Sequence, residues 1–320
     1  MRMYMKKFSI CLAMLSMLST AVFANDNLWI YDPTAKTLTW TDPDGIENVV
    51  SNVTAKGTSL NIAGDNSNNP LVHTLDLSVP VADGYEITAM DGIFQYNNSI
   101  HTFISAPKFT VLKYDRFRFC SNLKTVRLND GLVSMGSQVF NGCPIEGDLY
   151  IPQTLKEMGA TCFTSSGITG DIVWPEGCTT YFGLPNASIT SFVGTKIKEY
   201  KNNCFSRNTC LTNVVLSMCM ETTAGGDWFD YGYVNCDVYW KSFPSNGMTK
   251  NPMGGHLIAN TITNHLAWHQ REIWRDFAAT NTMFKFTVPE KFGDYGVWGS
   301  QVTVWWVDPD HIQPSVIIIQ

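Results

Sequence analysis

The sequence predicts a β-rich solenoid, a right-handed superhelix of stacked coils, and three observations support this. Phenylalanine returns every 23 residues, at Phe94, Phe117, Phe140 and Phe163. Between these positions, short segments alternate apolar and polar residues, and a turn sequence follows each segment. A fixed period of this length is typical of repeat proteins, in which stacked coils bury a core that no single coil can bury.

Residues 1–24 have the pattern of a secretory signal peptide. Arg2, Lys6 and Lys7 make the beginning positively charged, and an apolar stretch that is too short to span a membrane follows over residues 8–23. We expect cleavage before Asn25 and a mature chain that is secreted or held at the cell surface.

The mature chain is predicted to be acidic. The full chain has 22 Lys and Arg and 28 Asp and Glu residues, and cleavage removes three basic ones, which leaves 19 against 28 and a net charge of −9. This charge argues against nucleic acid or an anionic membrane surface as the partner. No later segment approaches the ~20 consecutive apolar residues of a transmembrane helix.

Residues 25–66 predict an N-terminal β-cap. Two strand-like pieces, 28–31 and 38–40, are separated by turn residues, and the open end of a solenoid needs covering because it exposes unpaired strand. The sequence Asp42-Pro43-Asp44-Gly45 resembles the start of a calcium loop. The proline and the missing further ligands favour a plain turn.

Residues 67–257 predict the coils themselves. The pattern Leu123-x-x-Val126-x-Leu128 recurs as Leu211-x-x-Val214-x-Leu216, which is the alternation of a short strand with one face inward. A turn such as Asn129-Asp130-Gly131 follows, then a second short apolar pair, and the phenylalanine closes the coil.

Eight cysteines remain once Cys11 leaves with the signal peptide. An even number in an exported chain is compatible with disulfides. Cys120 and Cys143, however, occupy the same place in adjacent coils, three residues after the phenylalanine. Their side chains point in parallel, and cysteine is often a small buried residue. A column of buried thiols is therefore the simpler interpretation, and a disulfide stays an alternative.

Two segments resemble the BspA-type leucine-rich-repeat family, FNGCPIEGDLYIPQTLKEMGATCF at 140–163 and FCSNLKTVRLNDGLVSMG at 119–136. The resemblance covers about residues 70–240 and weakens at 182–205, where Phe182 and Phe205 are the nearest anchors. It implies a curved leucine-rich-repeat solenoid on a secreted or surface protein with a role in adhesion or protein binding. It implies no catalytic residue.

Residues 258–320 predict a C-terminal cap of a helix followed by strands. Ile262, Leu266, Ile273 and Phe277 follow roughly helical spacing, so we expect an amphipathic helix over 262–279. Two strand-like segments, 284–288 and 302–307, follow it. Together with the final apolar run they are expected to form a small β-cap.

The expected helix would place His265 and His269 on one face, with Glu272 one turn further. Two histidines at this spacing can bind zinc, but the metalloprotease motif needs glutamate directly after the first histidine, where Leu266 stands. No third ligand is evident. We therefore expect no metal and no cofactor.

The phase of the strands predicts a row of outward residues. In each first strand, the residue between the last two inward positions points away from the core. The members from Tyr150 to Tyr239 are all aliphatic or tyrosine. An extended apolar patch often marks an interaction site, although such residues also suit any pleated sheet. The row is Ile104, Arg127, Tyr150, Val173, Val193, Val215 and Tyr239, and the last six are the candidate partner-binding residues.

These features predict a non-enzymatic binding or adhesion protein whose solenoid surface holds a protein or glycan partner. Two other functions stay open at this point. One is a carbohydrate-acting enzyme with a carboxylate pair in its C-terminal region, and the other is a structural envelope protein that self-associates through its coil edges. No serine, cysteine or histidine stands in a recognisable nucleophile motif, which favours binding over catalysis.

Overall fold

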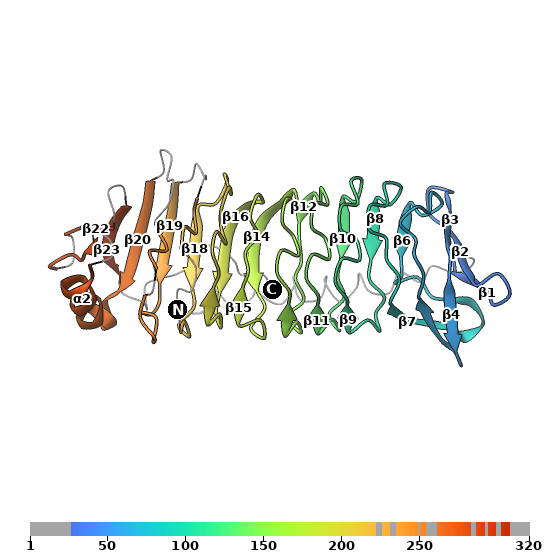
Figure 1. Ribbon diagram of the computed structural model, residues 1–320, viewed down its shortest axis with the longest axis horizontal. Coiled ribbons are helices and arrows are strands. Elements are labelled where there is room, and N and C mark those ends of the chain that lie inside the picture. The colour runs from blue at the N-terminus through green and yellow to red at the C-terminus, as the bar shows by residue number, and fades with distance from the viewer. Residues whose placement is uncertain are drawn as a thin grey trace, which may run out of the picture.

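The computed structural model is an elongated stack of coils, with the N-terminal sheets at one end and the only long helix described at the other (Figure 1). It describes residues 27–221, 226–230, 235–248, 250–253, 261–282, 286–291, 294–298 and 302–307. The predicted signal peptide and the apolar run at 316–319 lie outside these residues. Within them, no helix is long and apolar enough to cross a membrane.

The N-terminal end is built from hairpins. Strands β1 (Ile30–Asp32), β2 (Thr37–Thr41) and β3 (Glu47–Val50) form an antiparallel sheet. Strands β4 (Val53–Lys56) and β5 (Ser59–Ile62) are antiparallel, and β7 (Glu86–Met90) joins β5 in parallel. Between β2 and β3, Asp42 Oδ1 accepts hydrogen bonds from the backbone of Asp44 and Ile46. Residues 42–45 therefore form the plain turn that was expected.

One long side of the stack carries parallel strands from successive coils. A first sheet pairs β6 (Thr74–Asp76), β8 (Thr102–Ile104) and β10 (Thr125–Arg127). A nine-stranded sheet follows. Its order is β12 (Gly147–Asp148), β14 (Ile168–Trp174), β16 (Ser188–Gly194), β18 (Asn213–Leu216), β19 (Asn235–Trp240), β20 (Thr261–Ala267), β23 (Val302–Val307), β22 (Gly296–Trp298) and β21 (Phe286–Thr287).

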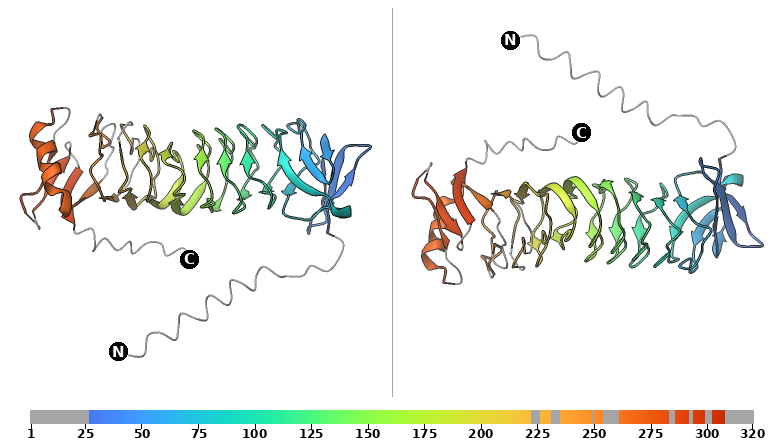
Figure 2. Two further views of the ribbon diagram at one scale, coloured as in Figure 1. Left: turned by 90° about the horizontal axis from the view of Figure 1, so that it is seen from below. Right: turned by 90° about the horizontal axis from the view of Figure 1, so that it is seen from above.

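The other side of the coils carries two-residue strands, which Figure 2 shows from above and below. β9 (Val111–Leu112), β11 (Ser134–Met135) and β13 (Glu157–Met158) form one parallel ladder, and β15 (Thr180–Tyr181) pairs with β17 (Glu199–Tyr200). The remaining described elements are the short 3-10 helices η1 (Ala82–Gly84) and η2 (Trp268–Gln270) and the helix α2 (Arg271–Thr280).

The periodic phenylalanines form a stack through the core. Ring centroids of successive members lie 5.4–5.5 Å apart, and the planes of Phe117 and Phe140 are inclined by only 5°. Phe94, Phe117, Phe140 and Phe163 are all fully buried. The backbone N–H of Phe117 donates to Val139 O, and that of Phe140 donates to Cys162 O, so each phenylalanine is tied to the residue that precedes the next one.

The expectation that Phe182 anchors the contracted coil is wrong, because Leu184 takes that place. Leu184 N donates to Cys204 O, which repeats the hydrogen bond of the phenylalanine column, and Leu184 is buried. Phe182 is only half-buried. Phe205 does lie in the column, and it stacks on Phe229 at 5.4 Å. A coil two residues shorter keeps its core by moving a neighbouring apolar residue inward.

The expected helix over 262–279 is wrong in its first half, since β20 occupies residues 261–267. Ile262, Asn264 and Leu266 point into the core, and Asn264 Oδ1 accepts a 2.6 Å hydrogen bond from Trp240 Nε1. The polar residue at an inward position interrupts the apolar alternation of the strand and hides it in the sequence. Helix α2 begins only at Arg271.

The cysteines of the described coils are free thiols, and six of the eight are buried. Cys120 Sγ donates to Phe94 O at 3.0 Å and Cys143 Sγ donates to Phe117 O at 2.8 Å. Each thiol therefore bonds the carbonyl of the phenylalanine one coil earlier. The column of buried thiols, rather than a disulfide, is what the structure contains.

We expect only Cys210 and Cys219, which are exposed, to react rapidly when the native mature chain meets iodoacetamide at pH 8. The thiolate is the reactive species, and burial raises the pKa of Cys162 and of Cys178 to about 12, so both stay protonated. Mass spectrometry should find two modified cysteines in the native chain and eight in urea. Rapid native modification of Cys143 would contradict this assignment.

Candidate binding surface

The predicted outward row is in register across the large sheet. Val173 pairs with Val193, Val193 with Val215, and Val215 with Tyr239, so these four side chains stand at one level on adjacent strands. Ile104 and Arg127 pair in the same way in the neighbouring sheet. Tyr150 lies just after the end of β12, outside any strand.

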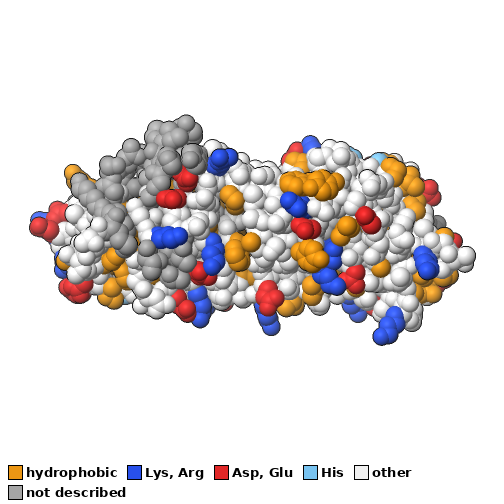
Figure 3. Space-filling view, in the orientation of Figure 1, with side chains coloured by type: hydrophobic (Ala, Val, Ile, Leu, Met, Phe, Trp, Pro, Cys, Tyr) orange, Lys and Arg blue, Asp and Glu red, His pale blue; other side chains and the backbone are white. Residues whose placement is uncertain are grey.

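Exposure along the row is uneven. Arg127 and Tyr150 are exposed, and Val173, Val193 and Tyr239 are partly exposed. Val215 is only 6% exposed, so the expectation that it offers an accessible outward side chain is wrong. In the view of Figure 3, hydrophobic side chains form separate groups rather than one band. The accessible row is therefore broken at β18.

Tyr150 is fixed by a polar contact at the edge of the row. Its hydroxyl donates a 2.6 Å hydrogen bond to Asp130 Oδ1. This bond and the nearby negative charge raise the pKa of Tyr150 to about 12. The side chain of Tyr150 is therefore neutral and held in one orientation. About half of its surface is exposed to solvent.

The row continues past Tyr239, where the sequence prediction had placed a helix. Tyr239 pairs with His265 of β20, and His265 pairs with Trp305 of β23. The Tyr239 and His265 rings stack with centroids 4.5 Å apart and planes inclined by 11°. The exposed Tyr295 ring lies 6.1 Å from that of Trp305. The signal for this extension was the recurring alternation in Val238-Tyr239-Trp240 and Val304-Trp305-Trp306.

A polar row runs beside the apolar one, two residues earlier on each strand. Asp171 pairs with Ser191, Ser191 with Asn213, and Asn213 with Asp237. Asp171 Oδ1 accepts a hydrogen bond from Ser191 Oγ at 2.6 Å. Asp237 Oδ1 lies 2.9 Å from His265 Nε2. The face therefore combines a partly apolar line with a polar line, in which Asp171, Asn213 and Asp237 reach the surface and Ser191 is buried.

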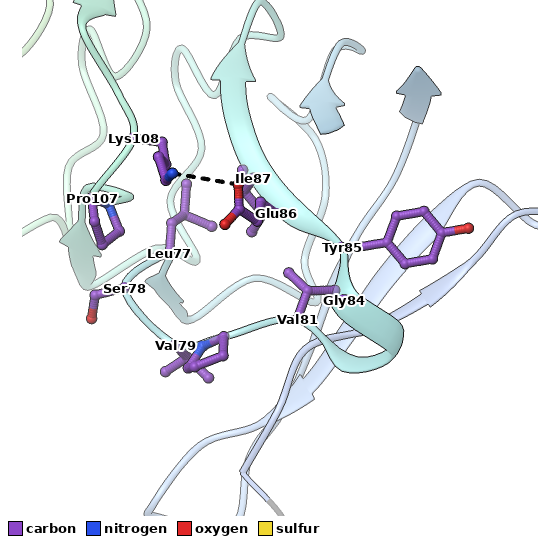
Figure 4. Close-up of a pocket in the computed structure, with 11 residues that line it drawn as sticks. Leu77, Ser78, Val79, Val81, Gly84, Tyr85, Glu86, Ile87, Pro107 and Lys108 are labelled. Atoms are coloured by element: carbon purple, nitrogen blue, oxygen red, sulfur yellow. Dashed lines mark ion pairs between the residues drawn. The ribbon is translucent and has the colours of Figure 1, made fainter. Parts of the chain in front are cut away.

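A separate cavity of about 320 Å³ lies beside the first coils (Figure 4). Leu77, Val81 and Ile87 border it, and Tyr85 points away from it. Its lining holds one carboxylate, Glu86, which pairs with Lys108 at 3.7 Å. The glycosidase alternative required two carboxylates at the C-terminal end, so this cavity does not supply the predicted site.

The two histidines lie on different elements. His265 belongs to β20 and His269 to η2, so the two no longer share a helix face, contrary to the expectation. His265 instead bonds Asp237. In the part of the chain that the structure describes, no three His, Cys, Asp or Glu side chains are grouped so as to hold a metal.

Comparison with known proteins gives a family match and a likeness to solved structures. Residues 88–212 match the model of the BspA type leucine rich repeat region in six copies. Among solved structures, the chain is similar to a leucine-rich repeat protein from Bacteroides ovatus ATCC 8483. The two share 13% identity with a TM-score of 0.40, over 89% of this chain and 76% of that one. No curated protein matches the chain.

Proposed function

Because residues 88–212 are a BspA-type leucine-rich-repeat region, we propose that this chain is a secreted or cell-surface protein that binds another protein without catalysis. Proteins of this repeat family are often surface or adhesion proteins. The proposed contact is the outward face of the strands on this side of the coils, with Arg127, Tyr150, Val173, Val193 and Tyr239 as the proposed partner-binding residues.

The observation that supports this proposal is the in-register row from Val173 to Trp305. Partly exposed apolar and aromatic side chains on a rigid parallel sheet lose little conformational freedom when a partner covers them. Tyrosine and tryptophan are also the residues most enriched at binding hot spots. Val215 would act from beneath this surface by supporting its neighbours, since it is buried.

We further propose that residues 25–66 and 258–320 cap the solenoid of residues 67–257. The hairpins β1 to β5 cover the first coil. At the other end, β20 and β23 extend the parallel sheet, and the antiparallel strands β22 and β21 close it. Antiparallel hairpins and α2 at the two ends hinder edge-to-edge pairing, which favours a monomeric binder over a self-associating one.

Val173→Glu and Tyr239→Glu are each expected to weaken capture of a protein partner by about tenfold or more, because each places a charge inside the buried contact. The test is binding of the mature chain to purified matrix proteins such as fibronectin, laminin and collagen, and to a glycan panel. Val111→Glu is the matched control, since Val111 is 46% exposed on the separate ladder of β9. Capture of glycans alone, or equal loss in the control, contradicts the proposal.

A further inference from the structure

A single arginine stands in a column that is otherwise apolar. The residue before each column phenylalanine accepts a hydrogen bond from the preceding coil, and Arg116 O accepts such a bond from Phe94 N. Its equivalents in other coils are all buried and uncharged: Val139, Cys162, Cys204 and Trp228. Arg116 itself is only 5% exposed. The coil therefore carries a nearly buried cation where its neighbours carry an apolar group.

The Arg116 guanidinium has no hydrogen-bond partner among the residues described, and its Nε is a buried donor without an acceptor. The carboxylates whose charges act on Arg116 are Asp91 and Asp115, and Asp115 Oδ1 is itself buried without a hydrogen-bond donor. Asp91 is already engaged, since it pairs with Lys113 at 2.5 Å and accepts a bond from Asn61 Nδ2. Desolvation lowers the pKa of Arg116, with Asp91 opposing that shift. An arginine stays charged at neutral pH.

An unpaired, nearly buried charge destabilises a fold, and an apolar side chain of similar size would suit this column better. Buried polar groups without partners are rare in native proteins, and each one calls for an explanation. An oxyanion is the group that would satisfy a guanidinium at this position, through two parallel N–H bonds to its oxygens.

Aromatic rings surround the same turn. Tyr114 is 66% exposed, and the Arg116 guanidinium lies 5.8 Å from its ring centroid. Arg118 lies 4.7 Å from the ring of Phe119, and Phe119 lies 5.3 Å from the ring of Tyr96, which is 56% exposed. Two arginines and three aromatic rings thus belong to this turn and to the matching turn of the preceding coil, and Tyr114 is the ring that lies beside Arg116.

The backbone holds two of these rings in an unfavourable conformation. Tyr96 and Phe119 have φ of 62° and 58°, in the left-handed region that bulky residues seldom adopt. The equivalent position in the next coil is Gly142, and a Cβ there would lie 2.3 Å from the Phe119 ring. The same turn position also has positive φ at Ser165, Asn186 and Arg207, so this conformation belongs to the repeat, and what differs here is that it carries two aromatic side chains.

We propose that Tyr96, Tyr114, Arg116, Arg118 and Phe119, named here the arginine turn, bind an acidic sugar. The Arg116 guanidinium holds the oxyanion, Arg118 adds a second positive charge to the same turn, and the exposed tyrosine rings offer flat faces to the sugar ring. The oxyanion is a carboxylate in a uronic acid or a sulfate ester in a sulfated sugar. This site lies on the phenylalanine turn rather than on the sheet face, so it is independent of the protein-binding surface proposed above.

The test measures affinity of the mature chain for three tetrasaccharides by calorimetry: oligogalacturonate, a heparin fragment and neutral maltotetraose. We expect an acidic tetrasaccharide to bind and maltotetraose not to bind. Arg116→Leu should weaken that binding by about tenfold or more, because it removes charge-assisted hydrogen bonds. Leucine suits the apolar column, so the thermal midpoint of the free variant should not fall. Lys56→Gln, an exposed site with the same charge change, is the matched control.

Binding of oligogalacturonate alone shows that a carboxylate suffices, and binding of the heparin fragment alone shows that sulfate groups are needed. Failure of both to bind overturns the proposal, and so does an equal loss in Lys56→Gln, which would indicate general electrostatic attraction. If Arg116→Leu does not fold, the same binding measurement is made on Tyr114→Ala and Arg118→Gln. Both side chains reach the surface, so these variants are expected to fold. Full binding in both of these variants overturns the proposal as well.

Discussion

Replacing Phe140 with alanine is expected to lower the free energy of unfolding of the mature chain by about 3–5 kcal/mol. Phe140 is fully buried between Phe117 and Phe163, at 5.4 Å from each, and Phe103 lies 6.0 Å away. The substitution leaves a cavity in the middle of a stack, and neither neighbouring ring can close it because each is held by its own coil. The loss therefore includes both the buried surface and the cavity.

Urea unfolding followed by far-ultraviolet circular dichroism measures this loss. Leu71→Ala is the control, since Leu71 is 52% exposed and should change the free energy of unfolding by less than about 0.5 kcal/mol. A loss below about 1 kcal/mol in Phe140→Ala would mean that the column relaxes into the space. In that case the phenylalanine stack would not be the main source of coil-to-coil stability.

The second large effect is expected at Trp240, which ties the last coils to the C-terminal elements. Its ring is fully buried, 5.7 Å from Trp228 and 5.3 Å from Trp298, and its Nε1 donates to Asn264. Trp240→Ala removes this packing and leaves Asn264 Oδ1 buried without a donor. We expect a loss of about 4 kcal/mol or more in the free energy of unfolding.

Trp240→Phe retains part of the packing, because it keeps a six-membered aromatic ring while it removes the hydrogen bond and the smaller ring of the indole. It should cost about 1–3 kcal/mol. Hydrogen exchange measures which strands lose stability. In Trp240→Ala, protection should drop first in β20 and β23, because repeat units contact mainly their neighbours. A uniform loss of protection across β6 to β23 would instead show that the whole stack unfolds as one unit.

The repeat was predictable from the sequence because each coil has the same local spacing of apolar residues. The period of 23 residues and the alternation in each first strand follow from side chains within one coil, and the match to the BspA-type family over 88–212 confirms that prediction. The thiols were also deducible, since Cys120 and Cys143 share a column. The alternation of inward and outward residues in each first strand was also enough to name the members of the outward row.

The extent of the outward row and the accessibility of its members could not be predicted. Both depend on residues that other coils bring next to the row. The sequence of residues 261–267 alternates like a strand only if Asn264 counts as an inward residue, and Asn264 is inward because Trp240 lies opposite to bond it. Likewise nothing local to Val215 distinguishes it from Val173 or Val193, yet it is buried. Accessibility depends on segments that are distant in sequence.

The sequence by itself determined the coil, its period and the column of phenylalanines, since each is a property of side chains a fixed distance apart along the chain. Only the tertiary structure decided that Arg116 is nearly buried without a partner, and that the outward row continues through His265 to Trp305. Those facts depend on which groups the stacking of coils brings together, and hydrogen bonds and burial across coils are set by that stacking rather than by local spacing.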